Sequence, residues 1–188
     1  MSDEIPILNM QQTKADQPLV TDVKQVLVIT NDSTVFLTKK WVSAYEMFGG
    51  RFTEVRNLVD RLKKHAQTSF GVISGQFGFV PSNYVIMEYS NVPSCKEEYE
   101  EAQERTDFVG KVEFVCRGFF DSIVVCVPKD MFAMLMPVLP RDKVIAVTSP
   151  DFKDACEERG WTFLPRSGAR VGNENADRII ELVDELEK

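Results

Sequence analysis

Residues 121–136, DSIVVCVPKDMFAMLM, decide the fold class. Residues 121–127 form a short run rich in Val and Ile, which predicts a buried β-strand. Pro128 is suited to the start of a helix, because proline has no N–H to contribute and a helix-compatible φ angle. Residues 129–136 are apolar nearly all round, so we expect a buried helix there. The stretch is therefore one strand–helix unit of the kind that builds parallel sheets.

Units of this type recur on both sides of that stretch. The other apolar runs that predict strands are residues 23–30, 70–73, 143–147 and 161–164. Helical patterns follow at residues 52–65, 94–105, 149–160 and from 173 onward. This alternation predicts an α/β fold, a three-layer, doubly wound and mainly parallel sheet of about five strands. Right-handed crossovers then place the carboxyl end of every strand on one edge of the sheet.

Several local signals refine the helices. Residues 38–48 predict a short helix that Gly49 and Gly50 end. Ser94 and Glu97 have the spacing of a capping box, and Asn173 is expected to cap the last helix. Residues 111–116 are compatible with either a strand or a helix.

Composition bounds the class of protein. The chain has 188 residues, which suits one α/β domain over residues 23–188 preceded by a polar arm over residues 1–22. The net charge of −7 disfavours bulk electrostatic binding of nucleic acid, and no run of apolar residues is long enough to cross a membrane. The first residues lack the pattern of a secretory signal, and the four cysteines form no CxxC pair. We therefore expect a cytoplasmic protein with buried thiols.

Several chemistries are excluded by the residues that are missing. His65 is the only histidine and lies at the basic end of a helical pattern, so a Ser-His-Asp or Cys-His nucleophile and a His/Cys zinc site are disfavoured. The sequence contains no GxxxxGK[ST] motif, and the glycines at 71, 75 and 78 do not have dinucleotide-binding spacing. We expect neither a metal nor a cofactor.

One loop at the predicted carboxyl edge is strongly cationic. Residues 165–173, PRSGARVGN, combine two arginines, two glycines and the start of a helix. Backbone amides, a helix dipole and guanidinium groups together suit a phosphate or carboxylate. The candidate anion-binding residues are Arg166, Ser167, Arg170 and Asn173. Alternatively, the glycines only turn the chain and the arginines pair with surface acids.

A second loop at that edge is both glycine-rich and aromatic. It lies in residues 71–90, GVISGQFGFVPSNYVIMEYS, where the candidate binding residues are Ser74, Gly75, Gln76 and Phe77. Glycine lets the backbone approach a ligand closely, Gln76 offers a donor and an acceptor, and Phe77 could stack on a planar ring. Alternatively, the aromatic side chains pack beneath the loop as a hydrophobic plug.

The same stretch resembles a segment of a diffuse group of poorly characterised bacterial and archaeal α/β proteins related to the peroxide-stress protein family. The resemblance covers about residues 70–90 and rests on residues Ser74, Gly75, Phe77, Gly78, Pro81, Ile86 and Tyr89. It implies a cytosolic α/β domain and no particular activity. A weaker likeness, carried by Gly75 and Gln76, is to the uracil-DNA glycosylase superfamily, in which an Asp stands where this chain has Phe77.

These observations lead to one functional hypothesis and two alternatives. We expect a domain that binds a small anionic molecule, with a nucleotide or nucleobase as one option, in a crevice between the two loops. The first alternative is an enzyme acting on a nucleobase or glycosidic bond, with Asp32 as the candidate catalytic residue. The second is a non-catalytic scaffold. Assembly into a homo-oligomer stays open.

Overall fold

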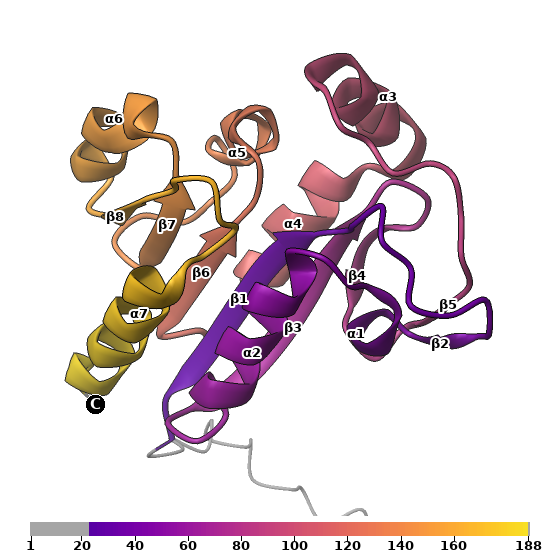
Figure 1. Cartoon of the computed structure of the whole chain (residues 1–188). Coiled ribbons are helices and arrows are strands. Elements are labelled where there is room, and N and C mark those ends of the chain that lie inside the picture. Colours follow the sequence, from indigo (N-terminus) through magenta and orange to yellow (C-terminus); the bar gives the residue numbers. More distant parts are fainter. Residues whose placement is uncertain (1–22, 188) are drawn as a thin grey trace, which may run out of the picture.

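The computed structural model describes residues 23–187 and contains one central six-stranded sheet (Figure 1). The strand order is β4-β3-β1-β6-β7-β8, and all neighbouring strands are parallel except the antiparallel pair β3–β4. The strands of this sheet are β1 (Gln25–Asn31), β3 (Gln67–Ser74), β4 (Gly78–Pro81), β6 (Ser122–Cys126), β7 (Val144–Thr148) and β8 (Thr162–Pro165). All five predicted strands are therefore confirmed in one sheet, and the expected α/β class is correct.

Helices cover both faces of the sheet, which gives three layers (Figure 1). The apolar stripes of α2 and α7 pack on one face, and α4, α5 and α6 pack on the other. The helices are α1 (Ala44–Met47), α2 (Phe52–Leu62), α3 (Lys96–Thr106), α4 (Phe108–Cys116), α5 (Lys129–Leu135), the 3-10 helix η1 (Pro150–Phe152), α6 (Lys153–Glu158) and α7 (Asn173–Glu185). Because β1 is covered on both faces, its central residues Val26–Ile29 are almost completely buried.

The order in which the chain adds strands to the sheet changes direction at β1. The chain leaves β1 for β3 on one side and later returns to β6 on its other side. In open α/β sheets, ligands bind outside the carboxyl ends of the strands at such a switch in direction. The topology therefore predicts that a ligand would bind near the loop that follows β1.

The structure corrects several local expectations. The glycine-rich loop after β3 contains strand β4, so residues 67–81 form a hairpin and the sheet has six strands. The helix expected over residues 38–48 is reduced to α1, which follows the short strand β2 (Val42–Ser43). Ser94 pairs with Glu98 and not with Glu97, and Gly172 precedes α7 at the capping position expected for Asn173. Residues 111–116, left open above, lie in α4.

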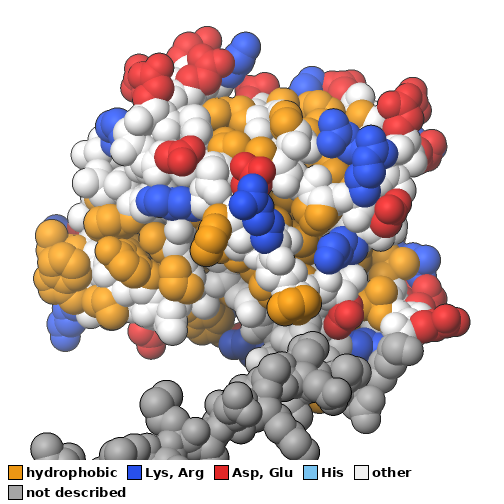
Figure 2. Space-filling model, turned by 180° about the vertical axis from the view of Figure 1, so that it is seen from behind, with side chains coloured by type: hydrophobic (Ala, Val, Ile, Leu, Met, Phe, Trp, Pro, Cys, Tyr) orange, Lys and Arg blue, Asp and Glu red, His pale blue; other side chains and the backbone are white. Residues whose placement is uncertain are grey.

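A second, two-stranded sheet joins β2 to β5 (Val85–Ile86) beside the main one. Figure 2 shows apolar side chains gathered on the surface at this end of the molecule. The exposed apolar residues there include Leu37, Trp41, Val85 and Met87. Nothing else in the described chain covers them.

The cysteines differ in their exposure to solvent. Cys126 and Cys156 are completely buried, as expected, while Cys95 is exposed. Burial raises the pKa of the Cys126 thiol to about 12.

Within residues 23–187, no helix is both long and apolar enough to cross a membrane. The predicted arm, residues 1–22, lies outside the described residues.

Candidate functional site

A cavity of ≈ 360 Å³ lies over the carboxyl end of β1, at the position that the topology indicates. Its walls come from the loop after β1, the residues that precede α2, the loop before α3, and the loop between β8 and α7. The lining residues are Asn31, Asp32, Ser33, Thr34, Val35, Gly50, Arg51, Val92, Pro93 and Arg170. Two arginines and a buried carboxyl group thus meet in one small space.

Asp32 is the carboxyl group of this cavity, and it is only 1% exposed. Its Oδ2 accepts hydrogen bonds from the Gly75 N–H at 2.8 Å and from the Tyr89 hydroxyl at 2.6 Å. Its Oδ1 has no hydrogen-bond partner among the described residues. Burial raises the pKa of Asp32 to about 6, against the lowering effect of its hydrogen bonds and of Arg170. Asp32 therefore lines the cavity with a carboxyl group of which one oxygen has no partner among the described residues.

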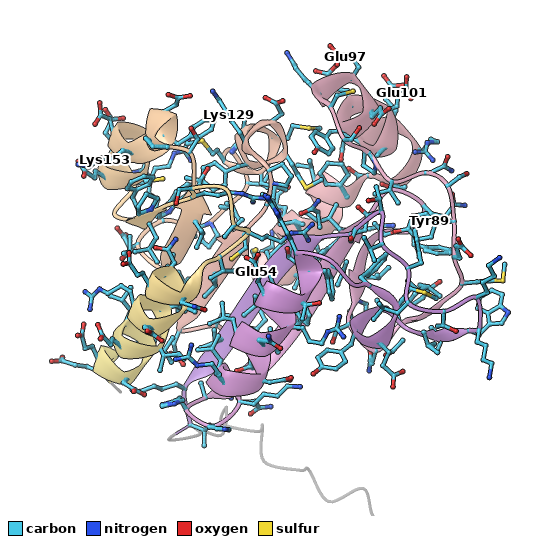
Figure 3. All side chains as sticks on the ribbon, viewed as in Figure 1. Glu54, Tyr89, Glu97, Glu101, Lys129 and Lys153 are labelled. Atoms are coloured by element: carbon cyan, nitrogen blue, oxygen red, sulfur yellow. The ribbon has the colours of Figure 1, made fainter. Side chains whose placement is uncertain are left out.

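The glycine-rich hairpin loop holds this carboxyl group in place. A Cβ atom on Gly75 would lie 1.9 Å from the carbonyl oxygen of Asn91, so only glycine allows the backbone to pass this close. The Ser74 hydroxyl donates to the Tyr89 hydroxyl at 2.8 Å, which in turn donates to Asp32. Tyr89, labelled in Figure 3, therefore connects the hairpin to the carboxyl group.

Arg170 is the most buried cation of the site, with 8% exposure. Its guanidinium group donates to the Asn31 carbonyl oxygen at 2.5 Å and to the Asp32 carbonyl oxygen at 3.0 Å. It also donates to the Thr30 hydroxyl at 3.2 Å. Glu54, at the first turn of α2 (Figure 3), accepts hydrogen bonds from the backbone N–H groups of Arg170 and Val171. These contacts fix the loop after β8 against the end of β1.

The arginines crowd one another. Burial and the neighbouring charge of Arg166 lower the pKa of Arg170 to about 10. Burial also lowers the pKa of Arg166, and the nearby charge of Arg51 lowers it further. Within residues 23–187, Nε of Arg170 and Nη1 of Arg166 are buried without a hydrogen-bond partner. An anion in the cavity would relieve this like-charge repulsion and supply acceptors.

The start of α2 adds to this positive potential. Gly50 and Arg51 line the cavity just before the first turn of this helix, where backbone N–H groups carry partial positive charge. The Arg51 side chain is exposed and donates to the carbonyl oxygen of Gly168. Arg51 therefore connects the cavity rim to the cationic loop.

The remaining candidate residues lie around this cavity and not in its wall. Gln76 is exposed, and its Oε1 accepts a hydrogen bond from the Asn91 side chain at 2.6 Å. The Phe77 ring packs against Tyr84 and Tyr89, at centroid distances of 5.8 Å and 5.7 Å. Ser167 is exposed, and its carbonyl oxygen accepts from the N–H of Ala169. Of the predicted residues, Asp32 and Arg170 line the cavity, and the Gly75 N–H donates to Asp32.

Asn173 lines a different cavity, of ≈ 480 Å³, between α2 and α7. This larger cavity also includes Glu54, Arg61 and Ala176. The buried polar groups without partners among the described residues belong mainly to the edge of the sheet near Asp32, since Asn31, Thr148 and Arg170 are among them. We therefore place the candidate site in the smaller cavity.

Sequence reasoning missed Arg51 and Tyr89. The signal for Arg51 was the Gly49-Gly50-Arg51 turn between the first strand and an amphipathic helix, a position at which helix N–H groups face the strand ends. Tyr89 lies 57 residues from Asp32, and no local pattern indicates their hydrogen bond.

No group of three or more His, Cys, Asp or Glu residues in the described part of the chain could hold a metal ion. Comparison with protein-family models gave no match. Comparisons with curated proteins and with solved structures likewise gave no significant match. The resemblances of residues 70–90 therefore stay predictions, and a functional proposal rests on the site itself.

Proposed function

We propose that this protein binds a small anionic molecule in the cavity at the carboxyl end of β1. Arg51 and Arg170 contact the anion, and Arg166 strengthens the positive potential from behind them. The volume of ≈ 360 Å³ falls at the lower end of the range of about 300–1,000 Å³ typical of small-molecule sites. A ligand no larger than a mononucleotide suits a space of this size.

One observation carries this proposal: Arg51 and Arg170, from separate segments, line one cavity at the sheet edge although the protein carries a net charge of −7. The repulsion between the cations and their N–H groups without partners among the described residues are unfavourable terms in the unliganded protein, although the hydrogen bonds of Arg170 stabilise the fold. Arrangements of this kind are typical of ligand sites, where binding supplies the missing interactions.

A second candidate function is an enzyme, and the Asp32 carboxyl group favours it. A pKa of about 6 lets this group accept and donate a proton near neutral pH, as general acid–base catalysis requires. Release of a free base from a nucleoside monophosphate, dependent on Asp32, would place the protein in this class. Binding without turnover would place it in the first.

We expect Arg51→Gln to weaken binding of inorganic phosphate by about tenfold, because it removes one charge-assisted hydrogen bond to the anion. The fold should be unaffected, since the Arg51 side chain is exposed and its hydrogen bond is to a surface loop. NMR titration of the amide signals with inorganic phosphate measures the affinity and locates the site. The wild-type protein should show shifts at Asp32, Gly50 and Arg170.

Arg61→Gln is the matched control. Arg61 lies in the last turn of α2, the helix that Arg51 precedes, and is also exposed, but it lines the larger cavity and pairs with Asp177 at 2.7 Å. Its substitution removes the same charge from the opposite end of this helix and should leave phosphate affinity within about twofold. A loss of affinity in Arg61→Gln but not in Arg51→Gln would move the site to the groove between α2 and α7.

A further inference from the structure

Two residues of the cavity wall carry hydrogen-bond acceptors without partners among the described residues. Asn31 and Asp32 follow one another at the end of β1, line the cavity, and are 5% and 1% exposed. Oδ1 of each is buried and has no hydrogen-bond partner among residues 23–187. A buried acceptor without a partner is destabilising and is rarely retained unless something else satisfies it.

These acceptors restrict the chemistry of the ligand. Inorganic phosphate would satisfy Arg51 and Arg170, but its few hydroxyl groups sit on the phosphorus atom that the arginines hold, and the ionised carboxylate would repel it. A molecule that carries hydrogen-bond donors a short distance from its anionic group would satisfy both sides of the cavity. Two such residues in the cavity wall suit a ligand with more than one hydroxyl group.

We propose that the ligand is a phosphate monoester of a polyhydroxylated molecule, with its phosphate on Arg51 and Arg170 and its hydroxyl groups on Asn31 and Asp32. This inference rests on the anion-binding function proposed above and specifies its ligand class. Phosphate is favoured over carboxylate because the two guanidinium groups and the start of α2 offer donors to more than two oxygens.

The substitution Asp32→Asn distinguishes the contacts of the ligand's hydroxyl groups from the contacts of its phosphate. The amide oxygen can still accept from the Gly75 N–H and the Tyr89 hydroxyl, so the local hydrogen bonds are retained. At the position of Oδ1, the acceptor oxygen is replaced by an NH₂ donor, and the negative charge of the side chain is lost. The substitution should therefore weaken binding of a hydroxylated ligand and at the same time favour a bare anion.

The test is calorimetric titration of the full chain with ribose 5-phosphate, O-phosphoethanolamine and inorganic phosphate. We expect the wild-type protein to bind ribose 5-phosphate at least about tenfold more tightly than inorganic phosphate. In Asp32→Asn this preference should fall by about tenfold, while affinity for inorganic phosphate is unchanged or rises. If O-phosphoethanolamine is preferred to ribose 5-phosphate, the donor is an ammonium group and the polyol assignment is overturned.

Further outcomes separate this inference from the proposed function. Equal affinity of the wild-type protein for all three probes, or an equal effect of Asp32→Asn on all three, would overturn the inference and leave the anion site intact. Binding of none of them would overturn both. Should Asp32→Asn fail to fold by circular dichroism, Asn31→Ala removes the neighbouring acceptor and should reduce the same preference.

Discussion

Arg170→Ala should lower the free energy of unfolding by roughly 3–5 kcal/mol, the effect expected when one partner of a buried charged network is removed. The Arg170 guanidinium group connects the loop after β8 to three oxygens at the end of β1. Removing it leaves the carbonyl oxygens of Asn31 and Asp32 without these donors in a buried position. Urea denaturation followed by circular dichroism measures the change.

Arg178→Ala is the control for this experiment. Arg178 lies on the exposed side of α7 and pairs with Glu181 and Glu185 on the surface. Its substitution should change the free energy of unfolding by less than about 1 kcal/mol. An Arg170→Ala protein as stable as this control would mean that the guanidinium group does not hold the β1 loop.

Asp32→Asn should have the opposite effect and stabilise the unliganded protein at pH 7 by about 3 kcal/mol. Burial raises the pKa of Asp32 from 3.8 to about 6, and each pKa unit corresponds to about 1.4 kcal/mol between the two protonation states. The folded protein therefore retains the proton more strongly than the unfolded chain does, and ionisation of Asp32 at neutral pH destabilises the fold.

The contribution of Asp32 to the stability of the wild-type protein depends on pH. The folded pKa of Asp32 lies above the unfolded value. The wild-type protein therefore has the stabilising contribution of protonated Asp32 in full below about pH 4 and loses it as the pH rises through about 6. The groups that face Asp32 are Arg170, Tyr89 and, at longer range, Tyr99 of α3. The pKa of both tyrosines is raised, first by burial, so neither titrates in this window.

The measurement is urea denaturation of both proteins at several pH values. The advantage of Asp32→Asn should shrink from about 3 kcal/mol at pH 7 to about 1 kcal/mol near pH 4.5. Taking the difference between the two proteins removes the contribution of the other carboxyl groups. An advantage that does not vary with pH would show that Asp32 titrates normally in the folded protein.

The sheet was predictable because its strands are short runs of Val, Ile and Leu that stay apolar on both faces. The helix over residues 52–62 was equally clear from its spacing of apolar residues. Strand β4 was missed, because its residues Gly78–Pro81 read as a loop in isolation. It forms because Phe79 covers Gly71 on the neighbouring strand, where a Cβ would lie 2.3 Å from the ring. Such a contact depends on pairing and not on local sequence.

The edge of the sheet at which the candidate cavity lies was predictable, and the residues that line the cavity were less so. Asp32 and Arg170 were identified because each follows a strand, and strand ends share one edge in a parallel sheet. The directions of Gln76 and Phe77 depend on the hairpin that β4 creates, so their positions outside the cavity could not be anticipated. Arg51 enters the site because α2 starts at the same edge, a consequence of how the long loop after β1 folds.

The most direct test of an anion site at the end of β1 is a crystal structure of the wild-type protein with ribose 5-phosphate. We expect electron density for the phosphate in the cavity of ≈ 360 Å³, within hydrogen-bond distance of the guanidinium groups of Arg51 and Arg170. The sugar hydroxyl groups should lie against Asn31 and Asp32. Density only in the groove between α2 and α7, or an empty cavity at a saturating concentration of the compound, would contradict the assignment of the site.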